Sequence, residues 1–420
     1  MPDHLILKNI DTLAGIVNSE QLLKSGGEMA EFESIHNAWL EIKDGLISDF
    51  GIGEPLKESL TADYYLIDCK GGSVFPSFCD SHTHLVYAGS REIEYIDKIK
   101  GLSYEEIAKR GGGILNSAAR LHNSSEDQLF TDALERINEI LEWGTGAVEI
   151  KSGYGLNTED ELKMLRVIRR LKETSSLVIK STFLGAHAVP SEYKGRQGAY
   201  VDLVVNEMIP KVAEERLADF IDVFCDKGFF TVDETERMLE AGINYGLKPK
   251  IHANELDYSG GIQAGVRYHA LSTDHLEYTG DEEIEALKGS GTMATVLPGA
   301  AFFLNMVHAP VRKMINSGLP IALASDFNPG SSPSGNMQLI LSMGCIMFRM
   351  TPQEAFNAST LNGAYAMGIS DMAGSITHGK IANLYITKPI PSIEYMPYYY
   401  GFNKIEHVIL KGKLIEKIAQ

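Results

Sequence analysis

Two histidines one residue apart give the strongest chemical signal in this sequence. His82 and His84 stand in Asp80-Ser-His-Thr-His, directly after an apolar run that predicts a strand. Residues i and i+2 of a strand face the same side, so both imidazoles can converge on one point. Two neutral imidazoles at this spacing supply half of a transition-metal site. Taken alone, such a pair is more often an ordinary surface or core feature.

Three more strand-like runs end in side chains of matching chemistry. These endings are His252-Ala-Asn-Glu255, Asp274-His275 and Ser325-Asp326-Phe327-Asn328. A single Asp in such a place usually caps a helix, and a single buried His is usually only hydrogen-bonded. Four polar endings of this kind favour one shared site instead. His252 can add a third nitrogen ligand and Asp326 a carboxylate oxygen, which leaves one coordination position for water.

The elements that must position these side chains alternate regularly along the chain. Eight β-branched or apolar runs predict strands at residues 73–78, 147–151, 177–183, 220–224, 248–253, 270–273, 292–297 and 320–325. Helix-like segments such as 158–172 and 231–245 separate them, and Thr158 with Glu161 has the spacing of a capping box. Eight such repeats predict an α/β fold, a parallel (β/α)8 TIM-like barrel, whose chemistry lies at the carboxyl ends of the strands. An open doubly wound sheet is the alternative.

The two ends of the chain have a different pattern. Short strand-like pieces separated by glycine and charged turns occupy residues 1–70 and 380–420. Neither end has enough strands for a core of its own, so we expect them to build one small composite, sandwich-like β-domain. Residues 71–379 are then the catalytic barrel.

Composition excludes several functional classes. The chain has 420 residues, 44% of them hydrophobic, and a net charge of −18, which argues against disorder and against nucleic acid or an anionic membrane as a partner. Four scattered cysteines form no Cys-x-x-Cys pair, which predicts neither a disulfide framework nor a cysteine zinc site. The first residues lack a signal-peptide pattern, and the apolar segments 293–307 and 339–348 are too short or interrupted to span a bilayer. We therefore expect a cytoplasmic protein.

Longer motifs give this sequence a family resemblance. They are Phe75-Pro-Ser-Phe-Cys-Asp-Ser-His-Thr-His-Leu-Val-Tyr-Ala-Gly, Glu149-Ile-Lys-Ser-Gly-Tyr-Gly-Leu, Thr182-Phe-Leu-Gly-Ala-His-Ala-Val-Pro and Ala324-Ser-Asp-Phe-Asn-Pro-Gly. Over nearly the whole chain the sequence resembles the amidohydrolase superfamily and, within it, the hydrolases that open an imidazolone ring during histidine breakdown. The resemblance implies one divalent or trivalent ion per chain, zinc or iron, and a homodimer. It implies a small-molecule substrate, 4-imidazolone-5-propanoate, converted to N-formimidoyl-L-glutamate.

The resemblance also implies roles for particular residues. The metal ligands are His82, His84, His252 and Asp326, and the catalytic residues are Glu255, His275 and Asp326. The substrate-binding residues are Arg91, Tyr154, His187, Glu255, Asn328, Gly330 and Ser331. Lys151 does not stand where dinuclear relatives carry a bridging carboxylated lysine, which favours a single metal ion.

Elementary chemistry agrees with these roles. A metal-activated water can attack the ring carbonyl, while Glu255 moves a proton to the leaving nitrogen and His275 assists. Arg91 can hold the propionate in two-point contact, although its type and position also fit a solvated loop charge. Two other functions fit the pattern less well. They are a deaminase acting on a cyclic amidine, which would release ammonia, and an inactive scaffold, which would have lost ligands.

Overall fold

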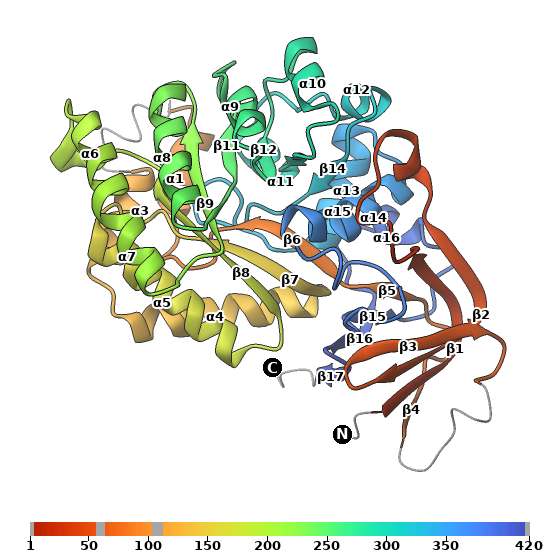
Figure 1. Cartoon of the computed structure of the whole chain (residues 1–420). Coiled ribbons are helices and arrows are strands. Elements are labelled where there is room, and N and C mark those ends of the chain that lie inside the picture. The colour runs from red at the N-terminus through yellow and green to blue at the C-terminus, as the bar shows by residue number, and fades with distance from the viewer. Residues whose placement is uncertain (1–3, 56–63, 103–111, 416–420) are drawn as a thin grey trace.

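A computed structural model describes residues 4–55, 64–102 and 112–415. Its larger sheet is built from parallel strands in the order β14-β13-β12-β11-β9-β8-β7-β6, with β10 paired to β9 (Figure 1). The strands are β6 (Phe78–Thr83), β7 (Thr145–Lys151), β8 (Val178–Ala186), β9 (Phe220–Cys225), β10 (Lys248–Pro249), β11 (Ile251–Ala253), β12 (Ser272–His275), β13 (Met293–Val296) and β14 (Ile321–Leu323). A parallel bridge between Thr83 and Phe327 joins the first strand to the segment after the last. The predicted barrel is therefore confirmed.

The first predicted barrel strand is wrong in one respect. Residues 73–78 form parts of two sheets, because β5 (Val74–Pro76) pairs with the strands of the chain ends and only β6 belongs to the barrel. The backbone N–H of Ser77 donates to Asn383, whereas the next N–H, of Phe78, donates to Gly144 in the barrel. Both sheets bury apolar side chains, so hydrophobicity alone cannot locate the change of sheet.

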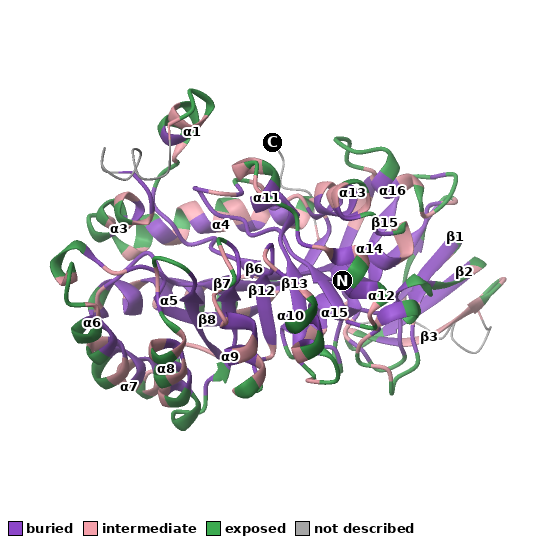
Figure 2. Ribbon diagram, turned by 90° about the horizontal axis from the view of Figure 1, so that it is seen from above, coloured by how far each residue is buried: buried purple, intermediate pink, exposed green. Residues whose placement is uncertain are grey.

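Helices surround the barrel and expose their outer faces, while the strands are buried (Figure 2). The α-helices are α1 (Glu92–Ile99), α3 (Ile114–His122), α4 (Glu126–Glu142), α5 (Thr158–Thr174), α6 (Gln197–Leu203), α7 (Ile209–Glu214), α8 (Val232–Asn244), α9 (Gly261–Arg267), α10 (Asp281–Leu287), α11 (Pro298–Leu304), α12 (Val311–Asn316), α13 (Met337–Phe348), α14 (Pro352–Ser359), α15 (Leu361–Ala366) and α16 (Tyr395–Tyr398). Short 3-10 turns lie at η1 (Gly26–Ala30) and η3 (Ser191–Tyr193), and η4 (Val204–Met208) is a π-helix. No helix in the described ranges combines the length and apolarity needed to cross a membrane.

Capping explains where α5 and α8 begin. Thr231 caps α8 and forms a capping box with Glu234. The capping box predicted at Thr158 is wrong, because Asn157 is the N-cap of α5 and accepts from the N–H of Asp160. The carboxylate of Glu161 does not cap the helix but binds the loop before it. The spacing of Thr158 and Glu161 is the same for both arrangements, so the sequence cannot distinguish them.

Both ends of the chain contribute to the second sheet. Its strands are β1 (His4–Ile16), β2 (Glu33–Lys43), β3 (Leu46–Ile52), β4 (Tyr65–Asp68), β5, β15 (Leu384–Thr387), β16 (Ile405–Leu410) and β17 (Lys413–Ile415). The order is β17-β16-β15-β5-β1-β2-β3, with β4 paired to β1. Side chains from both ends, such as Leu40 and Leu384, share one buried apolar cluster. This separate sheet of the two ends confirms the expected composite arrangement.

Candidate metal centre

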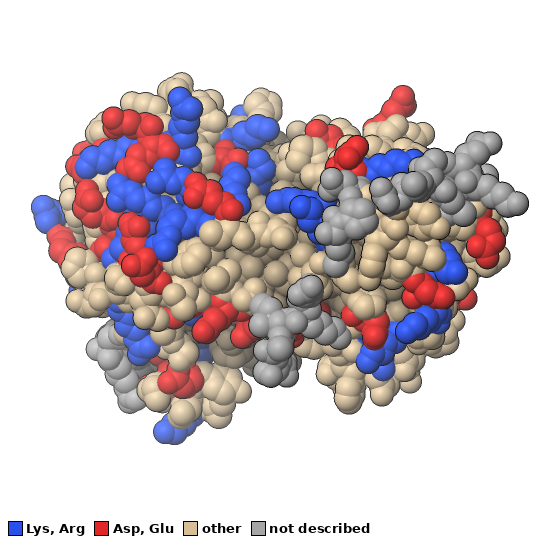
Figure 3. Space-filling view, turned by 90° about the horizontal axis from the view of Figure 1, so that it is seen from below, with Lys and Arg blue, Asp and Glu red and all other residues tan. Residues whose placement is uncertain are grey.

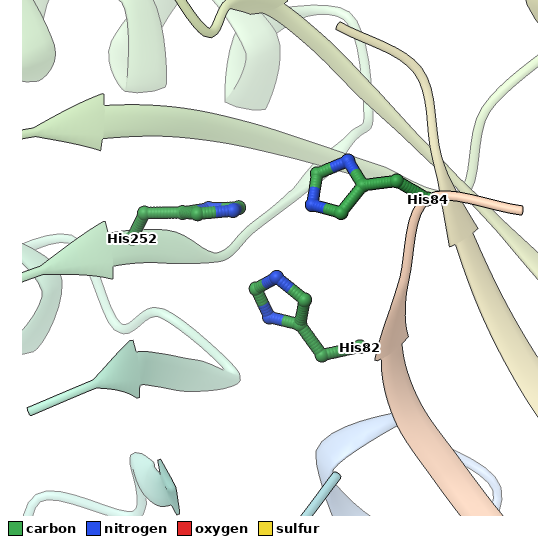
Figure 4. A group of neighbouring side chains, drawn as sticks. All are labelled: His82, His84 and His252. Atoms are coloured by element: carbon green, nitrogen blue, oxygen red, sulfur yellow. The ribbon is translucent and has the colours of Figure 1, made fainter. Parts of the chain in front are cut away.

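Three histidines from two distant strands meet at the mouth of the barrel. His82 and His84 come from the end of β6 and His252 comes from β11, and their candidate ligand atoms lie within 4.8 Å of one another (Figure 4). Asp326, which follows β14, places Oδ1 at 3.6 Å from Nε2 of His82 and 3.7 Å from Nε2 of His84. The four side chains predicted as ligands are therefore brought together.

The hydrogen bonds of these histidines leave nitrogen lone pairs free. Nδ1 of His82 lies 2.7 Å from Asp274, and Nδ1 of His252 lies 2.9 Å from Asp222, both at carboxylate oxygens. Within the described part of the chain, Nε2 of His82, Nδ1 of His84 and both ring nitrogens of His252 are buried without a hydrogen-bond partner. A carboxylate behind Nδ1 fixes the tautomer in which Nε2 can bind a metal. Three imidazoles and one carboxylate fit a catalytic zinc-type site with an open position.

Burial sets the protonation of the ligands. It lowers the pKa of His82, His84 and His252 well below the usual value of 6.5, so these imidazoles are neutral at neutral pH. Burial also raises the pKa of Asp326 to about 7. A cation bound beside Asp326 favours its ionised form and opposes this shift, so the group of ligands is suited to a positive ion.

Strained backbone is concentrated at the same strand ends. Asn254, His275, Leu276 and Asp326 all have positive φ angles, of 55°, 84°, 72° and 52°. Non-glycine residues adopt this conformation rarely and at a cost, and such residues gather at functional sites. Here they end or directly follow β11 and β12, or lie three residues after β14, close to the candidate ligands.

A cavity of about 590 Å³ opens beside the four candidate ligands. Besides three of those ligands, its lining includes every other residue for which a catalytic or substrate-binding role was predicted: Arg91, Tyr154, His187, Glu255, His275, Asn328, Gly330 and Ser331. His82 does not line the cavity. The guanidinium group of Arg91 is not a solvated loop charge, because only 8% of its side chain is exposed and Nε and Nη2 both donate to Glu94. The individual roles of these residues stay predictions.

Two titratable groups face each other in this cavity. Oε2 of Glu255 lies 3.6 Å from Nδ1 of His275. Burial, followed by the nearby Asp326 carboxylate, raises the pKa of Glu255 to about 8, whereas burial lowers the pKa of His275 to about 4. Glu255 is thus able to hold a proton near neutral pH, and His275 is neutral and able to donate a hydrogen bond.

The loop after β14 holds the candidate ligand Asp326 in place. The side-chain oxygen of Asn328 accepts from the N–H groups of Gly330 and Ser331, and its amide donates to the carbonyl of Asp326. The hydroxyl of Ser331 donates to Oδ2 of Asp326 at 3.2 Å. Asn328 therefore organises the loop, and Ser331 orients the carboxylate toward the histidines.

Comparison with known proteins agrees with this geometry. The model of the amidohydrolase family matches residues 73–415. The chain belongs to the amidohydrolase family. An imidazolonepropionase of Flavobacterium johnsoniae is 54% identical over 98% of this chain and 99% of its own length. An imidazolonepropionase of Christiangramia forsetii is also 54% identical, over 98% of this chain and its full length. The resemblance drawn from the motifs is confirmed.

Solved structures of two deaminases share the fold. Escherichia coli guanine deaminase superposes with a TM-score of 0.76 at 13% identity, covering 99% of each chain. The 5-methylcytosine deaminase of Klebsiella pneumoniae gives 0.72 at 18% identity, covering 97% of this chain and 98% of its own. At such low identity these similarities concern the fold alone.

Several functional residues of this amidohydrolase were not foreseen. Asp222 and Asp274 support the histidine ligands, and Lys151 lies behind them with Nζ 2.8 Å from Asp222 and 2.7 Å from Glu149. Lys151 is thus fully buried in ion pairs below the candidate metal centre. A charged residue inside an apolar run, as in Phe220-Ile-Asp-Val-Phe, is the sequence signal that could have identified Asp222.

Tyr154 and His187 form an aromatic wall next to the candidate ligands. The ring of His187 stacks on His84 with centroids 5.1 Å apart, and that of Tyr154 lies 5.8 Å from His84. Nδ1 of His187 lies 3.0 Å from the carbonyl of Gly153. The loop that carries Tyr154 is fixed by Glu161, whose carboxylate accepts from the N–H groups of Gly153, Gly155 and Leu156.

Replacing Glu161 by alanine should therefore affect both stability and binding. Three buried N–H groups lose their acceptor, which should lower the free energy of unfolding by about 2 kcal/mol or more. Loosening of the Tyr154 loop should raise KM. Urea denaturation and steady-state kinetics measure both effects. Glu161→Gln is the matched control, because it keeps one acceptor oxygen and should lose less. Equal stability of Glu161→Ala and wild type would show that the carboxylate does not fix this loop.

Proposed function

We propose that this amidohydrolase hydrolyses the cyclic amide C–N bond of 4-imidazolone-5-propanoate to give N-formimidoyl-L-glutamate, a step of histidine degradation. The observation that carries the proposal is the meeting of His82, His84, His252 and Asp326 beside a cavity that is also lined by the largely buried side chain of Arg91. The high identity to proteins named imidazolonepropionase supports the choice of substrate.

The metal is the first part of the proposed mechanism. We propose one ion, zinc or iron, on His82, His84, His252 and Asp326, since amidohydrolases are metal-dependent and the donor set fits. When bound, such an ion lowers the pKa of water toward neutrality and polarises a carbonyl oxygen. The remaining chemistry is the transfer of protons and the placement of the ring.

Glu255 and His275 serve proton transfer. In its ionised form Glu255 accepts a proton as water attacks the ring carbonyl, and it then returns this proton to the ring nitrogen as the C–N bond breaks. The raised pKa of Glu255 suits the second step, because near neutral pH the carboxyl group still carries the proton that the ring nitrogen must receive. Neutral His275 donates a hydrogen bond to the oxygen that gains negative charge. Asp326 would be the carboxylate ligand of the ion.

Arg91 is the proposed partner of the propionate. Arg91→Met should lower kcat/KM for the acid by roughly 10- to 200-fold, because a charge-assisted pair contributes about 1.5–3 kcal/mol. The same imidazolone without the carboxylate should be turned over almost equally by both proteins. Arg91→Lys should recover only part of the loss, since an ammonium group cannot make the planar two-point contact. An unchanged ratio of the two kcat/KM values in wild type and variant would contradict this role.

The proposed reaction is tested by identifying its products. Purified protein incubated with 4-imidazolone-5-propanoate should yield N-formimidoyl-L-glutamate in equal amount to the substrate consumed, without ammonia. Ammonia release would indicate a deaminase instead, and an inert protein with bound metal would indicate a scaffold.

We also propose a cytoplasmic homodimer in which residues 1–70 and 380–420, joined by strand β5, form one domain and the rest of 71–379 forms the other. Free cysteines support the compartment, since Cys69, Cys79, Cys225 and Cys345 form no disulfide within the described ranges. Light scattering tests the oligomeric state. The substrate is the only partner that the proposal requires, with neither nucleic acid nor membrane.

A further inference from the structure

Helix α1 carries a second cation, Lys98, beside the cavity. Its position in the sequence did not indicate this. Lys98 follows Arg91 by seven residues, about two helical turns, so it lies on the same side of α1, and it also lines the cavity. Its Nζ donates to the carbonyl of Gly330 at 3.0 Å and lies 5.5 Å from the ring centroid of Phe303. Figure 2 shows α1 standing clear of the helices that surround the barrel, so this helix is placed to contribute to the cavity rather than to the barrel wall.

Lys98 and Arg91 converge on the same glycine. A β-carbon on Gly330 would clash with Nη1 of Arg91, so this nitrogen is packed against the Gly330 backbone, while Nζ of Lys98 donates to the Gly330 carbonyl. Nε and Nη2 of Arg91 are occupied by Glu94, which leaves Nη1 as the arm beside Gly330. The two cations therefore approach one point of the cavity wall from the same helix.

The charge balance of this group depends on Lys98. Glu94 neutralises Arg91, so the pair alone carries no net charge to attract an anion. Among the described residues Lys98 forms no ion pair, and it supplies the one net positive charge of the three. The chain as a whole carries −18, and acidic and basic side chains are intermixed on the face in Figure 3, so attraction must be local.

We infer that Lys98 is a specificity-determining residue that binds the substrate carboxylate together with Arg91, an inference that rests on the proposed function. The rings of Tyr95 and Phe303 stack with centroids 5.1 Å apart, and Nζ of Lys98 lies over the ring of Phe303 at the edge of the cavity. Arg91 offers Nη1, the arm that Glu94 does not occupy, and Lys98 supplies the excess positive charge. A substrate without a carboxylate gains nothing from either group.

The protonation of Lys98 supports the inference. Burial, followed by repulsion from Arg91, lowers the pKa of Lys98 to about 8, although the carboxyl groups of Glu94 and Glu255 act in the opposite direction. The group is charged below that pH and loses its proton above it. The KM for the acid should therefore rise above about pH 8, and the KM for the neutral analogue should not follow the same curve.

The test compares Lys98→Met with wild type on two substrates. These are 4-imidazolone-5-propanoate and the same ring without the carboxylate. Lys98→Met should raise KM for the acid about ten-fold with little change in kcat, and should change KM for the neutral ring less than two-fold. Lys98→Arg should restore most of the affinity. Lys100→Met is the matched control, because Lys100 ends the same helix outside the cavity lining and should behave as wild type.

The outcomes separate this inference from the proposed function. Equal losses on both substrates would assign Lys98 a structural role, and unchanged KM values would remove it from the subsite; each result overturns the inference while the wild-type reaction stands. A wild type that does not open the ring of the acid overturns the proposed function and the inference with it. Circular dichroism and metal content, both expected to be unchanged in Lys98→Met, exclude misfolding as the cause.

Discussion

Asp326→Ala should lose both bound metal and turnover by orders of magnitude. The carboxylate is the only oxygen donor in the predicted ligand set, and its Oδ1 lies between Nε2 of His82 and Nε2 of His84. Without it, the ion loses one of its four ligands and the one negative charge among them, so the three neutral imidazoles should hold it less tightly. His82→Ala should give the same result, since it removes a ligand whose orientation is set by Asp274.

The measurement is metal content by mass spectrometry together with kcat. Asp219→Ala is a suitable control, because Asp219 is a partly buried carboxylate that binds Lys180 and the N–H of Ser181 away from the cavity. This control should keep the metal and the activity. Wild-type metal content and rate in Asp326→Ala would contradict the assignment of the ligands.

Glu255→Gln should separate proton transfer from metal binding. The amide is nearly isosteric with the carboxyl group but cannot accept or return a proton, so kcat should fall by roughly 10²–10⁴-fold. Metal content should remain close to that of the wild type, because Glu255 is not among the four ligands. The contact with His275 at 3.6 Å should be retained in kind, so substrate binding should change less than turnover.

The pH dependence provides a second readout for the same variant. In the protein without metal, the pKa of Glu255 is about 8, and a nearby cation lowers it. The kcat of the wild type should change with pH as Glu255 ionises. The kcat of Glu255→Gln should lack this change. Normal turnover by the variant would mean that proton transfer depends on His275 or the metal and not on Glu255.

The barrel was predictable because its signals are local and repeated. Strands such as β7 and β9 are short apolar runs between amphipathic helices, and this alternation allows few other topologies. The convergence of the candidate ligands was predictable because polar side chains at the ends of parallel strands meet at one edge. The division of residues 73–78 between the two sheets was not predictable, since both sheets accept the same apolar side chains.

The supporting residues were harder to predict because their roles depend on contacts across the fold. Asp222 lies 30 positions before His252, and Lys98 is 232 positions from Gly330, so no local spacing connects either pair. The spacing of Glu161 fits a capping box, yet its carboxylate binds the preceding loop. Three backbone N–H groups of that loop donate to it, whereas a capping box would offer it one. These contacts are determined by packing in the folded protein.

Metal titration of the chelated protein tests the central claim most directly. Protein stripped of metal should remain folded and should not convert 4-imidazolone-5-propanoate. Activity should return in proportion to added Zn²⁺ or Fe²⁺, reach its maximum at one equivalent per chain, and yield only N-formimidoyl-L-glutamate. Full activity in the stripped protein, or a maximum at two equivalents, would contradict ring opening at a single ion held by His82, His84, His252 and Asp326.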